Sequence, residues 1–189
     1  SDALNGEANF TYNGTALAVT CDTATFTSAN SNDPLVIIKN TTNDTKGAIL
    51  RFVKDKGAAG AANDIAGLIQ FYADDANQDN ILFSEIKSQV KVHTNGEEGG
   101  KFTISVAEHD GTSTAGLLIE DGNADGELDV TIGAGTSSTT TISGYIQIKG
   151  EQGSAPDAPA SGAGGYLYTK ADGKPYWISD DVSETDLTS

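Results

Sequence analysis

The chain has 189 residues, a formal net charge of −16 at pH 7 and a sequence pI near 4.2. Such acidity argues against binding to nucleic acid or to an anionic membrane surface, because both need a basic patch. Hydrophobic residues make up 37% of the chain, and no apolar run approaches the roughly 18 residues that cross a bilayer. We therefore expect no nucleic-acid partner and no membrane insertion. Cys21 is the only cysteine, which excludes an intrachain disulfide.

The N-terminal third divides into a connector and the beginning of a larger body. Residues 1–33 hold only short apolar patches between Asn, Gly and Ser, and we interpret them as a connector to an upstream part. The body, residues 34–126, opens with residues 35–39 (LVIIK), a continuous apolar run typical of a strand that is buried on both faces. Turn-forming residues follow, and residues 48–54 (AILRFVK) are the next expected strand.

The rest of the body alternates between strands and turns. The next expected strands are residues 65–73, 81–93, 101–109 and 115–120. In residues 81–93 the aliphatic side chains share one parity and the polar ones share the other, which predicts one packed and one solvated face. The aliphatic set is Leu82, Ile86, Val90 and Val92, and the polar set is Glu85, Lys87, Gln89 and Lys91. Asn95 and Gly96 predict a hairpin turn, after which Phe102, Ile104 and Val106 should face inward.

Residues 127–150 (ELDVTIGAGTSSTTTISGYIQIKG) form the stretch on which the predicted architecture depends. Aliphatic residues alternate with polar ones on both sides of a Gly-Ala-Gly turn, from Leu128 to Ile132 and again from Ile142 to Ile148. A face this thin cannot bury itself within one chain, so identical copies should cover it. We expect an all-β, elongated, fibrous homotrimer with a β-rich body, an intertwined or prism-like β shaft and a small C-terminal β-hairpin tip.

The C-terminal part is expected to be a linker followed by a separate tip. Residues 151–165 are rich in Pro, Gly, Ala and Ser, as linkers are. Residues 166–189 contain two aromatic strands around an Ala-Asp-Gly-Lys turn. Its aromatic residues are Tyr166, Tyr168, Tyr176 and Trp177. Two interpretations of these rings stay open: they stack on a receptor sugar, or they are the only core that so small a hairpin has.

One turn has the pattern of a calcium-binding loop. Asp121, Asn123 and Asp125 lie in the sequence DGNADG, which matches the opening of an EF-hand loop. The twelfth position holds Ile132 where a bidentate Glu is required, and a strand follows where a helix should. A Ca²⁺ site and a solvated turn are therefore both open, and no other cofactor is expected. Residues 74–80 form a second acidic loop with the same two alternatives.

The sequence gives no sign of an active site. A hydrolase needs two carboxylates in reach of each other, and no spacing brings together any two of the strand carboxylates. These carboxylates are Glu85, Glu108, Glu120 and Asp129. His93 and His109 lack the partner spacing of a zinc site. We therefore expect no enzymatic activity.

Residues 35–135 resemble a module of phage tail-fibre and other virion-appendage proteins, especially those of marine phages. The matching runs are LVIIKNTTNDTKGAILRFVKDKGAAGAANDIAGLIQFYADD, EIKSQV, EEGGKFTISVAEHDG and GELDVTIGAG, and GGYLYTKADGKPYWISDD is similar to the closing hairpins of such fibres. The resemblance implies a trimeric structural protein located in the virion, with itself, other virion proteins and a host-surface glycan or protein as partners. It implies a role in host attachment and carries over no catalytic residue.

Two other functions suit the same residues. A cellular extracellular adhesin stalk or filament subunit would share the β-rich, acidic sequence. A Ca²⁺-dependent carbohydrate-binding module would combine the acidic turn with exposed aromatic rings. The first differs from a phage fibre in origin, and the second differs in being a monomer that Ca²⁺ stabilises.

Overall fold

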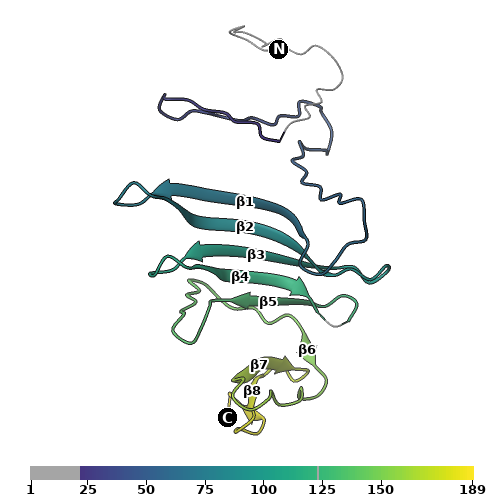
Figure 1. The fold of residues 1–189 in the computed structure, drawn as a ribbon. Helices are drawn as coiled ribbons and strands as arrows, with labels where there is room; N and C mark the ends of the chain where they lie inside the picture. Colours follow the sequence, from purple (N-terminus) through teal and green to yellow (C-terminus); the bar gives the residue numbers. More distant parts are fainter. Residues whose placement is uncertain (1–21, 123) are drawn as a thin grey trace, which may run out of the picture. The chain divides into compact units, whose positions relative to one another are not determined.

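The computed structural model describes residues 22–122 and 124–189, which form nine β-strands and no helix (Figure 1). The prediction of an all-β protein is confirmed. Residue contacts divide the chain into two units, Ser1–Phe52 and Val53–Ser189. Most of the predicted connector, Cys21 and the candidate ligand Asn123 lie outside the described residues.

The described part of the first unit, residues 22–52, contains turns and extended chain but no strand. The turn predicted between residues 40 and 47 is present, and the Asn40 side chain accepts a hydrogen bond from the Thr42 amide at 2.8 Å. The strand predicted at residues 35–39 is absent, and Leu35 and Ile37 are each 71% exposed. That prediction was wrong for the single chain, because an apolar run becomes a buried strand only where a neighbouring strand pairs with it. The strand predicted at residues 48–54 is absent for the same reason.

Five strands of the second unit form one antiparallel sheet, ordered β1-β2-β3-β4-β5 along the chain (Figure 1). The strands are β1 (Ile65–Asp74), β2 (Asn80–Val92), β3 (Gly99–Ala107), β4 (Ser113–Asp121) and β5 (Leu128–Ile132). The first four confirm the strands predicted for the body. β5 is the opening of the predicted shaft, and it pairs with β4 from Leu117↔Ile132 to Asp121↔Leu128. The predicted boundary between residues 126 and 127 therefore lies between two paired strands.

A glycine forms the sharp turn between β2 and β3. Gly96 adopts φ = +85°, and the Glu97 amide donates a hydrogen bond to the Thr94 carbonyl at 2.9 Å. The hairpin predicted at Asn95 and Gly96 is thereby confirmed. A positive φ suits glycine because the residue has no Cβ to clash with the preceding carbonyl.

The register brings aliphatic residues into line across all five strands. Ile69, Ile86, Ile104, Leu117 and Ile132 are paired in sequence from β1 to β5. We call this side of the sheet the apolar face. Its other members are Phe71, Phe102, Val106, Ile119 and Val130. The parity predicted for β3 is confirmed, and in β2 it holds for Leu82, Ile86 and Val90, whereas a register shift pairs Val92 with Gly99 on the opposite parity. The inward residues remain open to solvent in the single chain: Phe102 is 37% and Val106 52% exposed.

The opposite, polar face is more closed than the apolar face. Glu85, Thr103 and Ser105 are buried on it, with Glu85 only 9% exposed. The Gln70 amide donates to the Glu85 carboxylate at 2.7 Å, and Lys87 Nζ lies 3.3 Å from the same carboxylate. The prediction that Glu85 lies on a solvated face was therefore wrong. Long polar side chains lie across the sheet and cover the shorter ones, so a polar face need not be a wet one.

Residues 133–150 follow β5 and contain no strand. The Gly133 amide donates to the Gly116 carbonyl at 2.9 Å, so the chain continues beside β4 for one residue beyond β5. Ile142 and Ile146 are exposed. The intertwined shaft predicted for this segment depends on contacts between copies and stays a prediction.

The C-terminal residues form a second sheet of four short strands, ordered β6-β7-β8-β9. The strands are β6 (Glu151–Gln152), β7 (Gly165–Lys170), β8 (Pro175–Ser179) and β9 (Thr185–Asp186). The predicted aromatic hairpin is β7 and β8, paired antiparallel around a turn in which Gly173 has φ = +77°. β6 pairs parallel with β7, so the first two residues of the predicted linker belong to this sheet.

The described part of the chain has almost no packed core. Among the described hydrophobic residues only Tyr168 and Tyr176 are buried, and no described side chain is less than 2% exposed. The accessible surface of the chain is 15749 Å², whereas a compact monomer of 19.5 kDa exposes about 8500 Å². The chain therefore leaves exposed a large surface that compact proteins bury.

Candidate functional site

The aromatic residues of the tip are divided between the interior and the surface. Tyr168 and Tyr176 face each other across β7 and β8, with stacked rings whose centroids are 5.9 Å apart. They are 6% and 9% exposed. Tyr166 is exposed on the same face of the hairpin, and Trp177 is exposed on the other. The four candidate rings therefore do not form one platform.

Both buried tyrosines use their hydroxyl groups. Tyr168 Oη donates to Glu184 and Tyr176 Oη donates to Asp172, each at 2.6 Å. Burial and the bond to Glu184 raise the pKa of Tyr168 to about 12. The bond to Asp172, followed by burial, raises the pKa of Tyr176 to about 12. Each hydrogen bond favours the protonated phenol, because a phenolate beside a carboxylate would be repelled.

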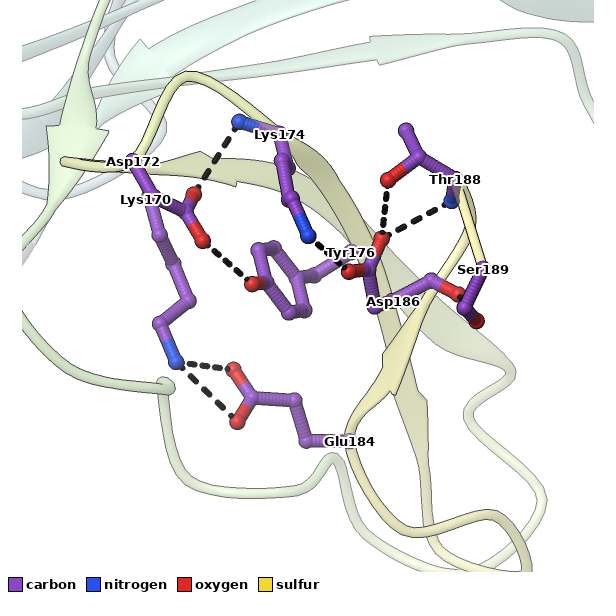
Figure 2. A network of polar contacts seen from close by, with 8 residues as sticks. All are labelled: Lys170, Asp172, Lys174, Tyr176, Glu184, Asp186, Thr188 and Ser189. Carbon is purple, nitrogen blue, oxygen red and sulfur yellow. Dashed lines mark hydrogen bonds and ion pairs between the residues drawn. The ribbon is translucent and has the colours of Figure 1, made fainter.

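Two lysines complete the network around Tyr176 (Figure 2). Lys170 Nζ lies 4.7 Å from the centroid of the Tyr176 ring, a cation–π distance, and forms an ion pair with Glu184 at 3.0 Å. Lys174 Nζ forms an ion pair with Asp186 at 2.6 Å. The bond from Lys174, with those from Thr188, lowers the pKa of Asp186 to about 2. Figure 2 shows the Tyr176 ring lying between these charged groups.

The same network holds the C-terminus in place. The backbone amide and the hydroxyl of Thr188 donate to Asp186 at 2.8 and 2.7 Å, and the Leu187 amide donates to the Pro175 carbonyl at 3.1 Å. These contacts attach β9 and the final residues to the hairpin. Tyr168 and Tyr176 thus have the surroundings of a small core, which agrees with the second of the two interpretations of the aromatic cluster.

Trp177 and Leu167 form the exposed apolar side of the tip. They are cross-strand partners, 36% and 49% exposed. The Trp177 ring lies against the backbone of Gly165, where an added Cβ would be 2.3 Å from Cζ2 of the ring. Sequence reasoning missed Leu167, although pairing the two strands around the turn would have placed it opposite Trp177. Trp177, Leu167 and Tyr166 are exposed on the tip, as are Val182 and Leu187.

The predicted calcium turn lies at the end of β4 beside the β2–β3 hairpin. Asp121 and Asp125 border an open hollow that Glu97 and Glu98 also line. The Asp121 carbonyl accepts a hydrogen bond from Lys91 Nζ. Within residues 22–122 and 124–189, no group of three or more His, Cys, Asp or Glu side chains is placed to hold a metal ion. With Asn123 undescribed, the Ca²⁺ site stays a prediction, and melting at matched ionic strength with and without Ca²⁺ tests it.

The second acidic loop is a turn in which Asp75 bonds to the backbone. The amides of Asn77 and Asp79 donate to the Asp75 carboxylate at 2.8 and 3.0 Å. Asx turns use a carboxylate in this way in the absence of any ion. The contacts therefore account for the Asp75 side chain without a metal.

The fold brings together one pair of carboxylates that sequence spacing did not predict. Glu120 on β4 and Asp129 on β5 are directly opposite each other. Lys101 is paired with Glu120 from β3, and Lys91 Nζ lies 3.6 Å from the Glu120 carboxylate. The two lysines balance the charge of the two carboxylates. Oppositely charged side chains on neighbouring strands stabilise a sheet.

No protein-family model matches the chain, and the comparisons with curated proteins and with solved structures find no match either. In the described part of the chain there is no helix long and apolar enough to span a membrane.

Proposed function

We propose that the chain is a structural fibre protein of a virus particle, a tail or head fibre, that assembles as a homotrimer and contributes to attachment to a host cell. One observation carries the proposal: the described chain forms two β-sheets, yet it buries only two hydrophobic side chains. Burial of apolar surface is the main favourable contribution to folding. A chain with so little of it needs further copies to complete its core.

The position of the exposed apolar residues supports assembly rather than catalysis. They extend through residues 35–53, the sheet β1–β5 and residues 142–146, instead of lining one concave site. Enzyme and small-ligand sites are usually single concave pockets. The resemblance of the sequence to virion-appendage proteins supports the virion as the proposed location of such an assembly.

The tip supports the attachment role. It is a compact end module, held by its own hydrogen bonds and ion pairs, and it presents Trp177, Leu167 and Tyr166 to solvent. Aromatic rings at exposed positions are common anchors in binding surfaces, including those for sugars and proteins. We propose that this module contacts the glycan or protein on the host.

Native mass spectrometry and cell binding test the proposal together. The full chain should be a trimer with no folded monomer at micromolar concentration, and fluorescently labelled protein should bind strains from a panel of marine bacteria. A chain ending at Gly150, which lacks the whole tip sheet, should remain a trimer but lose cell binding. A compact monomer would contradict the fibre. A trimer that binds no cell, with or without the tip, would favour a stalk or filament subunit.

Trp177→Ala separates a contact residue from a packing residue within the tip. Loss of cell binding with an unchanged melting temperature identifies Trp177 as a contact. A lowered melting temperature identifies it as part of the packing against Gly165. Tyr145→Ala is the matched control, because Tyr145 is a fully exposed aromatic residue outside the tip sheet.

A further inference from the structure

The apolar face of the sheet β1–β5 carries several hydrophobic side chains that are exposed in the described chain. Aliphatic residues are paired in one row across all five strands. Val130 and Ile132 on the edge strand β5 are 57% and 62% exposed, and Phe71 on β1 is 51% exposed. A sheet with one hydrophobic face must pack that face against another element to be stable in water.

The size of the face matches a stable protein interface. Five strands about 4.8 Å apart, each contributing about nine residues at 3.4 Å, cover about 700 Å². A standard interface buries about 800 Å² on each partner, whereas the largest apolar patch on a monomer is about 300–600 Å². The apolar face is therefore large enough to form an interface.

The distribution of charge identifies the partner. Charged side chains on the strands gather on the polar face, on Glu85, Lys87, Lys101, Glu120 and Asp129. By the register, the charged residues on the apolar face are Asp74 and Asp121, each at the end of its strand. Copies of a chain with net charge −16 repel one another, so they can approach closely only through a surface almost without charge. The apolar face is such a surface.

We propose that the apolar face of β1–β5 is the surface through which copies of this chain bind one another, each face packing against the same face of its neighbours. Closed symmetry makes this arrangement self-consistent, because every copy then offers and receives the same patch. The inference places the principal contact in the body, and it rests on the proposed function only for the number of copies.

Two neighbouring substitutions on the edge strand β5 test the proposal. Val130→Lys puts a cation on the apolar face, and Thr131→Lys puts the same cation on the opposite face of the same strand. Both positions are exposed in the single chain, so neither substitution disrupts its fold. Both also reduce the net charge from −16 to −15, so general repulsion between copies falls equally. Sedimentation velocity gives the state of assembly, and circular dichroism gives the β content.

Val130→Lys should raise the dissociation constant of the assembly at least about 100-fold, because a buried unpaired charge is strongly unfavourable. Thr131→Lys should leave it within about threefold of the unsubstituted chain, as expected for a charge that stays in water. Equal effects of the two substitutions, or no effect of Val130→Lys on an assembled protein, would overturn the proposal. The proposed fibre would survive that result if Ile142→Asp still dissociates the assembly.

An unsubstituted chain that is monomeric would overturn the proposal in a different way. In that case the face is covered by residues 35–53 of the same chain or by another virion protein. With either cover the chain does not self-associate, so the proposed trimer fails as well. The assembly state of the unsubstituted protein distinguishes this result from equal effects of the two lysine substitutions.

Discussion

The two sheets of this protein differ in how far they bury their hydrophobic side chains within the chain. The sheet β1–β5 has long strands and a continuous hydrogen-bonded register, but it leaves its apolar face exposed. The tip sheet has short strands, yet it buries two stacked tyrosines and bonds both hydroxyls to carboxylates only 4 and 16 residues away. The tip is therefore completed by contacts within its own sequence, whereas the body keeps an exposed apolar face, which in our proposal other copies cover.

The largest expected effect comes from removing one ring of the tip. Tyr176→Ala removes the ring that stacks on Tyr168, the hydrogen bond to Asp172 and the cation–π contact with Lys170. We expect the tip to unfold at room temperature while the body keeps its β structure. Trp177 is the only tryptophan, so its fluorescence reports on the tip alone, and circular dichroism reports on the whole chain.

Tyr145→Ala is the control for this change, since Tyr145 is fully exposed and should tolerate it. If Tyr176→Ala also dissociates the body, the two regions do not fold independently and the comparison fails.

The strand pattern of the body could be predicted from the sequence, since period-two alternation in β2 and β3 is a local signal. The pairing of β5 with β4 could not, because alternation gives the face of a strand and not its neighbour. The absence of a strand at residues 35–39 was missed for the same reason, because an apolar run does not show whether another strand pairs with it. In the tip, the hairpin followed from its turn, but β6 and β9 have two residues each and show no pattern.

The functional assignments were limited in a similar way. The sequence singled out the aromatic cluster, but it could not divide the buried Tyr168 and Tyr176 from the exposed Trp177. That division depends on Glu184 and Asp172, whose roles appear only when β9 and the turn are in place. The contact of Trp177 with Gly165 left no signal beyond the glycine itself.

Alkaline pH should unfold the tip before the body. The pKa of Tyr168 and Tyr176 is raised from 10.0 to about 12, so their contribution to stability is complete below pH 10 and is lost as the pH rises to about 12. The raised pKa of Lys174, due to Asp186, has the same sign. The midpoint of thermal unfolding reported by Trp177 should therefore fall by several degrees across this window.

Tyr168→Phe removes one titrating group and should flatten this decline, whereas Tyr145→Phe should not. On the acid side the pKa of Asp186 is lowered from 3.8 to about 2. Its contribution is complete above pH 3.8 and is lost as the pH falls to about 2. A tip with equal stability at pH 7 and pH 12 would show that the tyrosine hydroxyls are not bonded as described.

A comparable effect, confined to the tip, is expected where the tip backbone lies close to its tryptophan. In Gly165→Ala the new Cβ would lie 2.3 Å from the Trp177 ring and 2.8 Å from the Ile178 carbonyl oxygen. Overpacking of this kind costs about 1–3 kcal/mol, or a fall in melting temperature of about 5 °C or more in a small domain. The emission of Trp177 should shift towards that of a solvated indole. Gly153→Ala, which meets no atom within 4 Å, should change neither quantity.

Salt should have the smallest effect, with opposite signs in the two regions. Three copies at −16 carry a total of −48, and screening shortens from about 8 Å at physiological ionic strength to about 3 Å at 1 M. Assembly of the body should therefore strengthen with salt, and the melting temperature seen by circular dichroism should rise.

The tip depends on the ion pairs Lys170–Glu184 and Lys174–Asp186, which salt weakens. Since exposed ion pairs contribute about 0–1 kcal/mol, its melting temperature, followed by Trp177, should fall by no more than a few degrees. Parallel shifts of both signals would mean that the tip depends on the assembly after all, and the contrast between a self-contained tip and an open body would be lost.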